Sequence, residues 1–494
     1  MSRSLTIAVL VVAALSAVGG ALAVPSKSPS AAKPVPFKAT AVFAGATART
    51  VCAVLASPKV GKCWGYGSNA DSLDTDYYFS GSHRHSNLNN NPPGSGGGYA
   101  YGLRPGEMGN FLPSMHLPVG VATTTTITTI GNGIDSGYAR GCMLLSTGQV
   151  ACYGSNRRGL RGSFTQWSVD YLALPNIVKF ETSQLVASMS VGGLTTAVVF
   201  KDGTFASFGD GSDYSNFNGQ WFGLGYYINE QAVPLAKVGS GWSTAHAAVG
   251  YGHTCVLSTK GKIKCAGLNQ SGQCGQNDTS ATNSLVGQGY KYIGDHLPLV
   301  SLSSTLIAKA VYAGGYHSCA ALGTASTTSA LKYKCWGLNN YGQLGYGASI
   351  TQNVGTVPGQ MGDALPFVDL GSNVVVSMSL GNYHSVMLTS TGQLIAFGDN
   401  QYGQLGVGST TVPTDVPANL PYSYIGGKGL KVTSVAAGDG FTCFVANDGF
   451  VRCMGYNYYG ALGTGQFNTQ GTSLDDSGSN MTVVDLGSSV GTSG

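Results

Sequence analysis

One pattern recurs seven times along this chain: a short apolar run, then a glycine, then a turn rich in Gly and Asn. Units of this size that repeat through a chain are typical of architectures in which each unit buries its apolar face against the next. A spacing of roughly 60 residues favours the blades of a propeller, with local insertions. The recurring glycines are Gly65, Gly154, Gly209, Gly267, Gly337, Gly398 and Gly455.

Within each unit, short apolar runs alternate with turn residues, as in residues 310–322 and 375–388. The 74 glycines and a charged fraction of only 10% fit many turns between half-buried strands. The prediction is an all-β fold, a single seven-bladed β-propeller with four-stranded blades. We expect the propeller over residues 38–487, with blades at about 38–122, 123–180, 185–238, 244–301, 307–371, 373–424 and 431–487.

Two motifs in the later units resemble the regulator of chromosome condensation repeat family. The first is Gly-x-x-His-[Ser/Thr]-Cys, seen at residues 314–319, and the second is Cys-Trp-Gly-x-Asn-x-x-Gly-Gln-Leu-Gly, seen at residues 335–345. The resemblance covers roughly residues 38–487, cleanly in units four to seven and with insertions in units one to three. It implies a seven-bladed propeller.

The first residues predict export from the cell. Arg3 precedes an apolar run from Leu5 to Val18, and Ala21-x-Ala23 then forms a small-residue cleavage site. This pattern indicates a signal peptide at residues 1–23, with a retained membrane anchor as the alternative. A Pro/Ser/Ala linker at residues 24–37 and a tail at 488–494 complete the expected layout, and no later segment is apolar enough to span a bilayer. We therefore expect a secreted, extracellular protein in an oxidising environment.

The chain has 11 cysteines, which form five close pairs and one leftover. In three pairs the midpoint is a three-residue loop that ends in Gly, so the two cysteines fall opposite each other across a hairpin. Disulfides are the prediction, because the spacing is too long for a zinc motif. The pairs are Cys52–Cys63, Cys142–Cys152, Cys255–Cys265, Cys319–Cys335 and Cys443–Cys453. Cys274 takes the place of a repeat leucine and is expected as a buried free thiol, or else in an intermolecular bridge.

Non-repeating residues in units one to three are the predicted binding site. They include an insertion at residues 71–104, and they lie in the same turn of consecutive units, so one rim of the propeller is expected to carry them. Arg and aromatic residues are common anchors of protein interfaces. The alternative is solvated insertions without a role. The residues are Tyr77, Tyr78, His83, Arg84, His85, Arg157, Arg158, Tyr214, Phe217 and Trp221.

Other recurring polar residues receive structural interpretations. His253, His317 and His384 occupy one position in successive units, so they are expected to bond neighbouring backbone rather than to converge on a metal. His83 and His85 lack further ligands for a metal site. Asn269, Asn277 and Asn480 begin glycosylation sequons. The sequence predicts no metal and no cofactor.

The function predicted from these features is a disulfide-stapled extracellular scaffold that binds a protein or a glycan. A secreted enzyme inhibitor is the alternative, because such an inhibitor resembles this repeat fold. Guanine-nucleotide exchange, which the family resemblance suggests, and a hydrolase without a visible catalytic set are less favoured. We do not expect an enzyme. The net charge of +4 is too small to argue for nucleic acid as a partner.

Overall fold

A computed structural model describes residues 35–67, 99–101, 108–112, 114–115, 117–135, 138–154, 172–209, 232–233, 235–279, 285–286, 294–327 and 330–489. Two compact units divide the chain: one comprises Met1–Val35 and Ser489–Gly494, and the other is Pro36–Ser488. The described residues of the larger unit form β-strands and short 3₁₀ helices without an α-helix.

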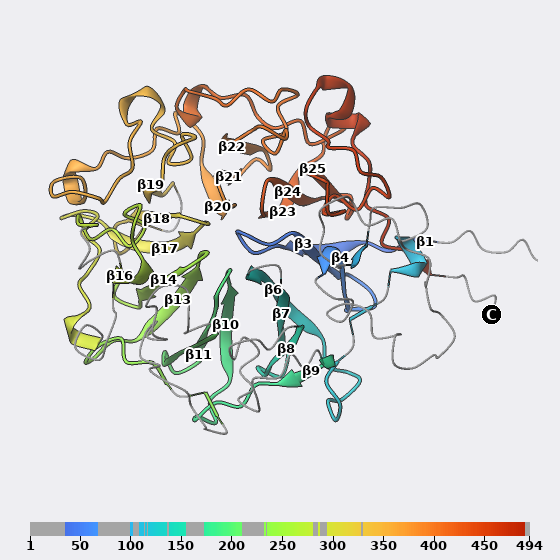
Figure 1. Cartoon of the computed structure of the whole chain (residues 1–494), viewed down its shortest axis with the longest axis horizontal. Helices are drawn as coiled ribbons and strands as arrows, with labels where there is room; N and C mark the ends of the chain where they lie inside the picture. Colours follow the sequence, from blue (N-terminus) through green and yellow to red (C-terminus); the bar gives the residue numbers. More distant parts are fainter. Residues whose placement is uncertain are drawn as a thin grey trace, which may run out of the picture. The chain divides into compact units, whose positions relative to one another are not determined.

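Seven sheets of three or four antiparallel strands make up the larger unit, and they follow one another in chain order around a ring (Figure 1). The innermost strands are β2 (Ala39–Phe43), β6 (Ile127–Asp135), β10 (Val186–Val191), β13 (Thr244–Val249), β17 (Ile307–Ala313), β20 (Val375–Leu380) and β23 (Val432–Ala437). Each innermost strand contacts that of the next sheet, and β23 contacts β2, so the ring closes. This arrangement leaves only short strand edges, which face the axis of the ring.

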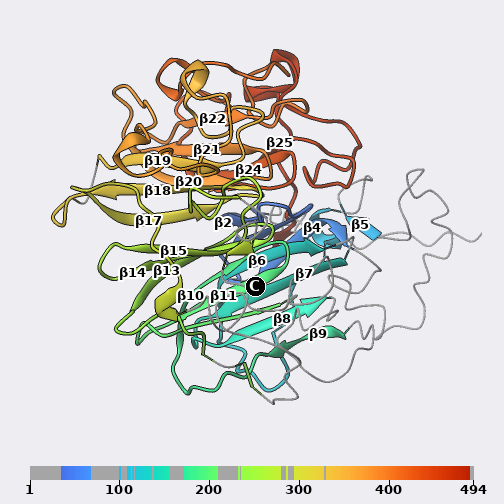
Figure 2. The same cartoon turned by 60° about the vertical axis from the view of Figure 1, so that its left-hand side comes forward.

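The second and third strands of each sheet form a hairpin. The second strands are β3 (Thr50–Leu55), β7 (Tyr138–Leu145), β11 (Thr195–Phe200), β14 (His253–Ser258), β18 (His317–Gly323), β21 (His384–Thr389) and β24 (Phe441–Ala446). The third strands are β4 (Gly61–Gly67), β8 (Val150–Gly154), β12 (Phe205–Gly209), β15 (Ile263–Leu268), β19 (Lys332–Gly337), β22 (Leu394–Gly398) and β25 (Val451–Gly455). Figure 2 shows the sheets stacked face to face.

The predicted fourth strand is present in three sheets, as β5 (Tyr99–Tyr101), β9 (Leu172–Ile177) and β16 (Leu285–Val286), whereas the other four sheets have three strands among the described residues. In two of those four sheets, the outer segment pairs with the third strand through isolated bridges, such as Gly337↔Val354 and Arg452↔Val483; the outer segments of the other sheets form no such bridge among the described residues. Pro366 and Pro421 lie in such segments. Proline has no N–H to donate, which restricts ladder formation at these positions.

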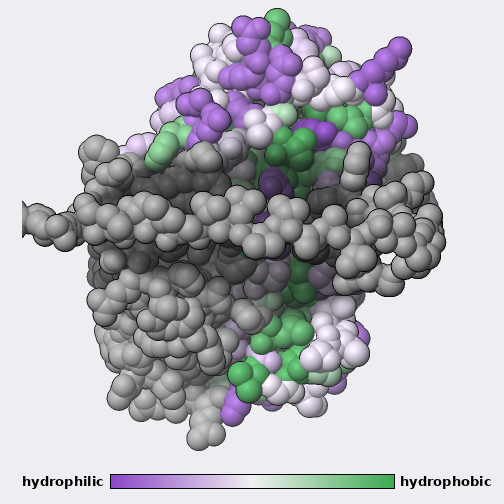
Figure 3. All heavy atoms as spheres, turned by 90° about the vertical axis from the view of Figure 1, so that its right-hand side faces the viewer, coloured by the Kyte–Doolittle hydropathy of each residue, from purple (hydrophilic) through white to green (hydrophobic). Residues whose placement is uncertain are grey.

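The chain also contains seven short 3₁₀ helices and one small additional sheet. The helices are η2 (Gly109–Phe111), η5 (Gly294–His296), η6 (Gly347–Ser349), η7 (Gly362–Ala364), η8 (Pro417–Asn419), η9 (Leu474–Asp476) and η10 (Gly478–Asn480), counted over the described residues. The additional sheet pairs β1 (Val35–Pro36) with β26 (Ser488–Ser489). On the side shown in Figure 3, hydrophilic residues gather on the described surface at the top.

The five predicted disulfides are confirmed. Each joins residues that face each other in the hairpin of second and third strands, with Cα–Cα separations of 4.0–4.1 Å. The two sheets without cysteines place Ala197 opposite Ser207 and Val386 opposite Ala396 at the same register. Cys274 is a free, buried thiol, which was one of the two states expected for it, the other being an intermolecular bridge.

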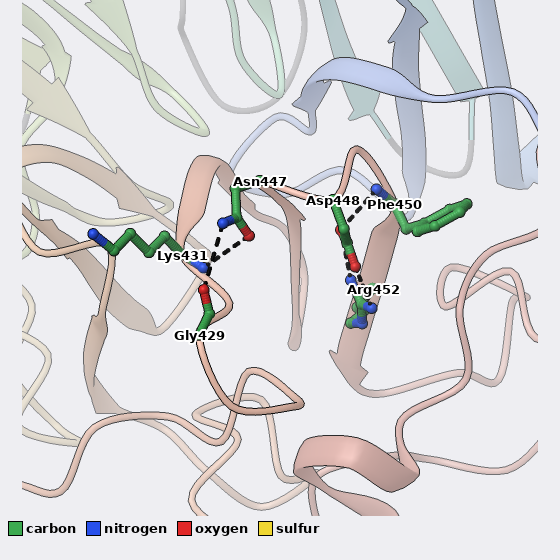
Figure 4. Close-up of polar contacts among 6 residues, drawn as sticks. All are labelled: Gly429, Lys431, Asn447, Asp448, Phe450 and Arg452. Carbon is green, nitrogen blue, oxygen red and sulfur yellow. Dashed lines mark hydrogen bonds and ion pairs between the residues drawn. The ribbon is translucent and has the colours of Figure 1, made fainter.

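The hairpin turns have the geometry that the sequence indicated. In the last sheet, Gly449 has a φ of +80°, and the Asp448 carboxylate accepts a hydrogen bond of 3.0 Å from the Phe450 N–H (Figure 4). The same carboxylate forms an ion pair of 2.7 Å with Arg452. Gly148 and Gly261 also have positive φ at the matching turns. A left-handed glycine closes this type of three-residue hairpin loop at no steric cost.

Candidate functional site

The residues predicted to bind a partner lie outside the described residues, so that interpretation stays a prediction. They are Tyr77, Tyr78, His83, Arg84, His85, Arg157, Arg158, Tyr214, Phe217 and Trp221. The described strands that precede them end at Gly67, Gly154 and Gly209, which are the ends of β4, β8 and β12. Third strands all end at the same end of the ring, where the loops after the innermost strands also lie.

Backbone hydrogen bonds join those loops into a band that runs from the third sheet through the seventh to the first. Gly193 N donates to Gly250 O at 3.0 Å, and Gly315 N donates to Gly381 O at 3.0 Å, each bond linking consecutive sheets. Asp439 N donates to Ala48 O at 2.9 Å, which links the last sheet to the first. Side chains on this band therefore hold fixed positions relative to one another.

Tyrosines cover part of this band. Tyr316 and Tyr383, from the loops of two consecutive sheets, lie with ring centroids 5.9 Å apart and planes inclined by only 15°. Tyr251 contacts Tyr316 at 5.6 Å, and Tyr341 contacts Tyr383 at 5.7 Å. These four rings come from the loops of three sheets, and all are half-buried.

A second group of tyrosines lies where the last sheet meets the first. Tyr402 contacts Tyr456 at 4.6 Å, and Tyr66 contacts Tyr459 at 4.8 Å. Tyr459 also contacts Tyr456 at 6.0 Å, so the rings form a connected set. The tyrosine face, as used below, comprises Tyr66, Tyr251, Tyr316, Tyr341, Tyr383, Tyr402, Tyr456, Tyr458 and Tyr459, together with Arg49 and Asp439.

An ion pair stands within the tyrosine face. Arg49 Nε donates to Asp439 Oδ2 at 2.9 Å, and the guanidinium carbon lies 4.6 Å from the centroid of the Tyr459 ring. Asp439 Oδ1 accepts a second hydrogen bond, of 2.9 Å, from the Asn382 amide. The Arg49 side chain keeps 37% of its surface exposed. Because a pair with that exposure is screened by water, its contribution to stability is small, and its effect is to orient the three side chains.

The hydroxyls of these tyrosines differ from those of the core tyrosines. Tyr333 and Tyr346 donate to the carbonyls of Val375 and Cys335, at 3.2 and 3.0 Å. By contrast, among the described residues no hydrogen bond engages the hydroxyls of Tyr316 and Tyr383. Burial, with the neighbouring tyrosines and Asp439, raises the pKa of Tyr316 to about 12, so its ring carries a neutral hydroxyl at physiological pH.

Three buried histidines tie consecutive sheets together beneath these loops. His253 Nε2 lies 2.9 Å from Ser318 Oγ in the next sheet, and Ser318 Oγ donates to Gln273 O at 2.9 Å. Since the hydroxyl proton goes to Gln273, the histidine Nε2 carries the proton that Ser318 accepts. His317 and His384 repeat this contact with the hydroxyls of the following sheets. The partner is therefore a hydroxyl of the next sheet, where the sequence predicted backbone.

These histidines do not form a metal site. Within the described part of the chain, no three His, Cys, Asp or Glu side chains are placed to hold a metal ion. The prediction for His83 and His85 concerns residues outside that part. The histidines are structural links that fix the position of one sheet against the next.

The three sequon asparagines occupy different environments. The Asn269 side chain is fully buried, and its amide nitrogen, the atom that would carry a glycan, donates to Asp278 O at 2.8 Å. Asn277 is half-buried in a left-handed conformation with a φ of 58°. Asn480 is exposed at the end of η10. Asn269 is thus a structural residue of the repeat turn.

Sequence reasoning missed the tyrosine face. The signal was present, because Tyr316 and Tyr383 each precede a recurring histidine, and a tyrosine recurs in the Asn-x-Tyr-Gly turns at Tyr341 and Tyr402. Each tyrosine taken alone resembled an ordinary turn residue. Only the ring arrangement brings tyrosines of different repeats into contact.

The closed ring of repeated hairpins, each held to its neighbours, defines a β-propeller stapled by disulfides. Comparison with known proteins identifies the repeats. The model of the regulator of chromosome condensation (RCC1) repeat matches residues 335–388 and 391–445, and a second model of the same repeat matches 245–273, 375–404 and 432–461. The chain therefore carries regulator of chromosome condensation repeats.

Named relatives share these repeats. Human protein RCC2 is 35% identical over 147 residues, which cover 30% of this chain and 25% of RCC2. The regulator of chromosome condensation of Xenopus laevis is 26% identical over 65% of this chain and 70% of its own length. The match thus spans only about a quarter of the RCC2 relatives.

Solved structures show the same fold. Prp20p of Saccharomyces cerevisiae has a TM-score of 0.55 and 18% identity, over 73% of this chain and 77% of its own. Human WBSCR16 has a TM-score of 0.55 and 17% identity, over 75% of this chain and 84% of its own. At such identities the similarity concerns the fold.

The prediction of a secreted, extracellular protein is wrong. The relative from Xenopus laevis is named for chromosome condensation, and Prp20p is described by its binding to Gsp1p and histones, names that describe no secreted protein. The prediction rested on two features. The first was a short apolar run before small residues, which is only a compositional signal. The second was the set of paired cysteines, whose bridging depends on the Cα separation across the hairpin. In the described part of the chain, no helix has the length and apolar character to cross a membrane.

Proposed function

We propose that this protein is a binding scaffold that holds a partner protein on its tyrosine face. The observation that carries the proposal is the two groups of partly exposed tyrosine rings at one end of the ring, with the rings in contact within each group. Tyrosine and arginine are enriched at protein interfaces, because they offer large contact areas together with hydrogen-bonding groups. The hydroxyls of Tyr316 and Tyr383, which form no hydrogen bond with the described residues, could bond such a partner.

Rigidity supports this proposal. The disulfides, the backbone bonds between loops and the histidine contacts hold the tyrosines in place before a partner arrives. A preorganised surface loses little conformational entropy on binding. Among the solved structures of the same fold, yeast RCC1 is bound to Kap60, and Prp20p is described by its binding to Gsp1p and histones. Proteins are thus the partners named for these neighbours.

The predicted rim of units one to three extends the same proposal. Its residues follow β4, β8 and β12 in the sequence, and these strands end at the end of the ring that carries the tyrosine face. A partner bound at that end would then contact both the tyrosine face and the predicted rim. Deleting residues 71–104 then separates the contribution of the first insertion from that of the tyrosines.

The test compares matched double variants of the full, disulfide-bonded chain as baits in an extract of the source cells. Y316A/Y383A removes the stacked pair of the tyrosine face. Y422A/Y424A removes two tyrosines that are 41% and 43% exposed in the segment before β23, away from that face, and serves as the control. Quantitative mass spectrometry should show bound proteins reduced about tenfold with Y316A/Y383A and unchanged with the control. Equal recovery with all three baits refutes the proposal.

A further inference from the structure

The charges of the ring are divided between its two ends. In the described loops that follow the innermost and third strands, Arg49 is the single Lys or Arg, whereas Asp278, Asp399 and Asp439 supply carboxylates. Lysines outnumber carboxylates in the described hairpin turns at the opposite end, which carry Lys59, Lys201, Lys260 and Lys262 beside Asp202 and Asp448. The described part of the tyrosine end is therefore acidic, although the whole chain has a net charge of +4.

The protein itself shows how this face holds a cation. Arg49 lies over the Tyr459 ring and bonds Asp439, so the cation meets an aromatic face and a carboxylate together. The face of a tyrosine ring is negative and attracts cations. Thr50, the residue after Arg49, pairs with Gly65, just as His317 pairs with Gly337. Arg49 therefore occupies the position in its sheet that Tyr316 occupies in a later one.

The neighbouring part of the face places further tyrosine rings near the carboxylate that Arg49 pairs, and no Lys or Arg from the described residues stacks on these rings. Tyr316, Tyr341 and Tyr383 form connected rings, and Asp439 lies close enough that its charge contributes, after burial, to raising the pKa of both Tyr316 and Tyr383. Asn382, which bonds Asp439, has a buried Oδ1 without a hydrogen-bond partner among the described residues. Aromatic faces beside a carboxylate suit a ligand that carries positive charge.

We propose that the part of the tyrosine face formed by Tyr316, Tyr341 and Tyr383 receives an arginine or lysine side chain from a basic segment of the partner. This inference rests on the proposed function and names the chemistry of its ligand. Charge complementarity favours a basic occupant over an acidic one, because the carboxylates of Asp399 and Asp439 lie close enough to Tyr383 to act on it electrostatically. Arg49 seated on Tyr459 is the arrangement that the partner's side chain would repeat.

The test uses two fluorescein-labelled peptides, octa-arginine and octa-glutamate, titrated with the full disulfide-bonded chain and followed by fluorescence anisotropy. We expect octa-arginine to bind at least about tenfold more tightly than octa-glutamate. Y316A/Y383A should weaken octa-arginine binding about tenfold, while Y316F/Y383F should keep it, because the ring face and not the hydroxyl attracts the cation. Y422A/Y424A should leave the affinity unchanged.

Each other outcome overturns the inference. Equal binding of the two peptides removes the charge selectivity, and octa-arginine binding that survives Y316A/Y383A places the cation elsewhere. Loss of binding in Y316F/Y383F assigns recognition to the hydroxyls. Equal urea midpoints for the variants and the wild type establish that the fold is intact. If partner capture depends on Tyr316 and Tyr383 but octa-arginine does not, the proposed function stands and the basic ligand is rejected.

Discussion

We predict that the ring loses stability in mild acid, because three of its histidines are buried. Burial lowers the pKa of His253 and His317 to about 3, and that of His384 to about 4, from an ordinary value of 6.5. The folded protein therefore keeps these imidazoles neutral while the unfolded chain protonates them. Because the unfolded state binds more protons, the free energy of unfolding falls as the pH drops below 6.5 and continues to fall until the folded pKa is reached.

The magnitude follows from the distance between the pH and the unfolded pKa. At pH 5 that distance is about 1.5 units, and each unit corresponds to about 1.4 kcal/mol, so each histidine removes about 2 kcal/mol of stability. The three together remove about 6 kcal/mol, of the order of the whole stability of many domains. At pH 5 carboxylates such as Asp448, whose pKa lies below its usual value of 3.8, remain ionised, so the loss of stability between pH 7 and pH 5 is assigned to the histidines.

Substitution of one histidine isolates its share. H317F uses the residue that the chain already has at the matching position of the last sheet, Phe441, which pairs with Gly455 as His317 pairs with Gly337. Equilibrium urea unfolding, followed by circular dichroism at pH 7, 6 and 5, measures the difference between wild type and variant. We expect the variant to be less stable at pH 7, and the gap to narrow by about 2 kcal/mol at pH 5.

H296Q provides the control, because His296 is exposed on η5 and should leave the pH dependence of the wild type unchanged. A gap between H317F and the wild type that is constant from pH 7 to pH 5 would show that His317 is not held neutral in the fold. The reasoning from burial would then also fail for His253 and His384, which are as buried as His317.

Two further predictions concern a disulfide and a glycine with positive φ. C255A/C265S recreates the Ala and Ser pair of a cysteine-free sheet and should lower the free energy of unfolding by about 2–3 kcal/mol through lost loop closure; an unchanged urea midpoint contradicts this role. G398A should destabilise the fold by more than about 1 kcal/mol, because Gly398 has a φ of +106° and an added Cβ would lie 2.6 Å from Tyr383 O. G427A, where an added Cβ meets no atom within 4 Å, is the control, and equal unfolding midpoints for the two variants would refute the argument.

The sequence alone was enough to predict the features that depend on residues close together along the chain. The pairing of Cys142 with Cys152 followed from a three-residue turn between them, because a short hairpin loop fixes which residues face each other. The seven-fold repeat and the all-β class followed in the same way from period and turn residues. The buried state of Cys274 followed from its place among the leucines of the repeat.

Tertiary structure decided what depends on contacts between repeats. Tyr316 and Tyr383 are separated by a whole repeat, and only the closing of the ring stacks their rings. The hydroxyl that each histidine meets also belongs to the next sheet. A fourth strand was expected in every sheet, but four sheets have three strands among the described residues, because pairing of an outer segment depends on how it packs against the third strand. Periodicity specifies each unit, whereas the distances between units are set by how the sheets pack around a common axis.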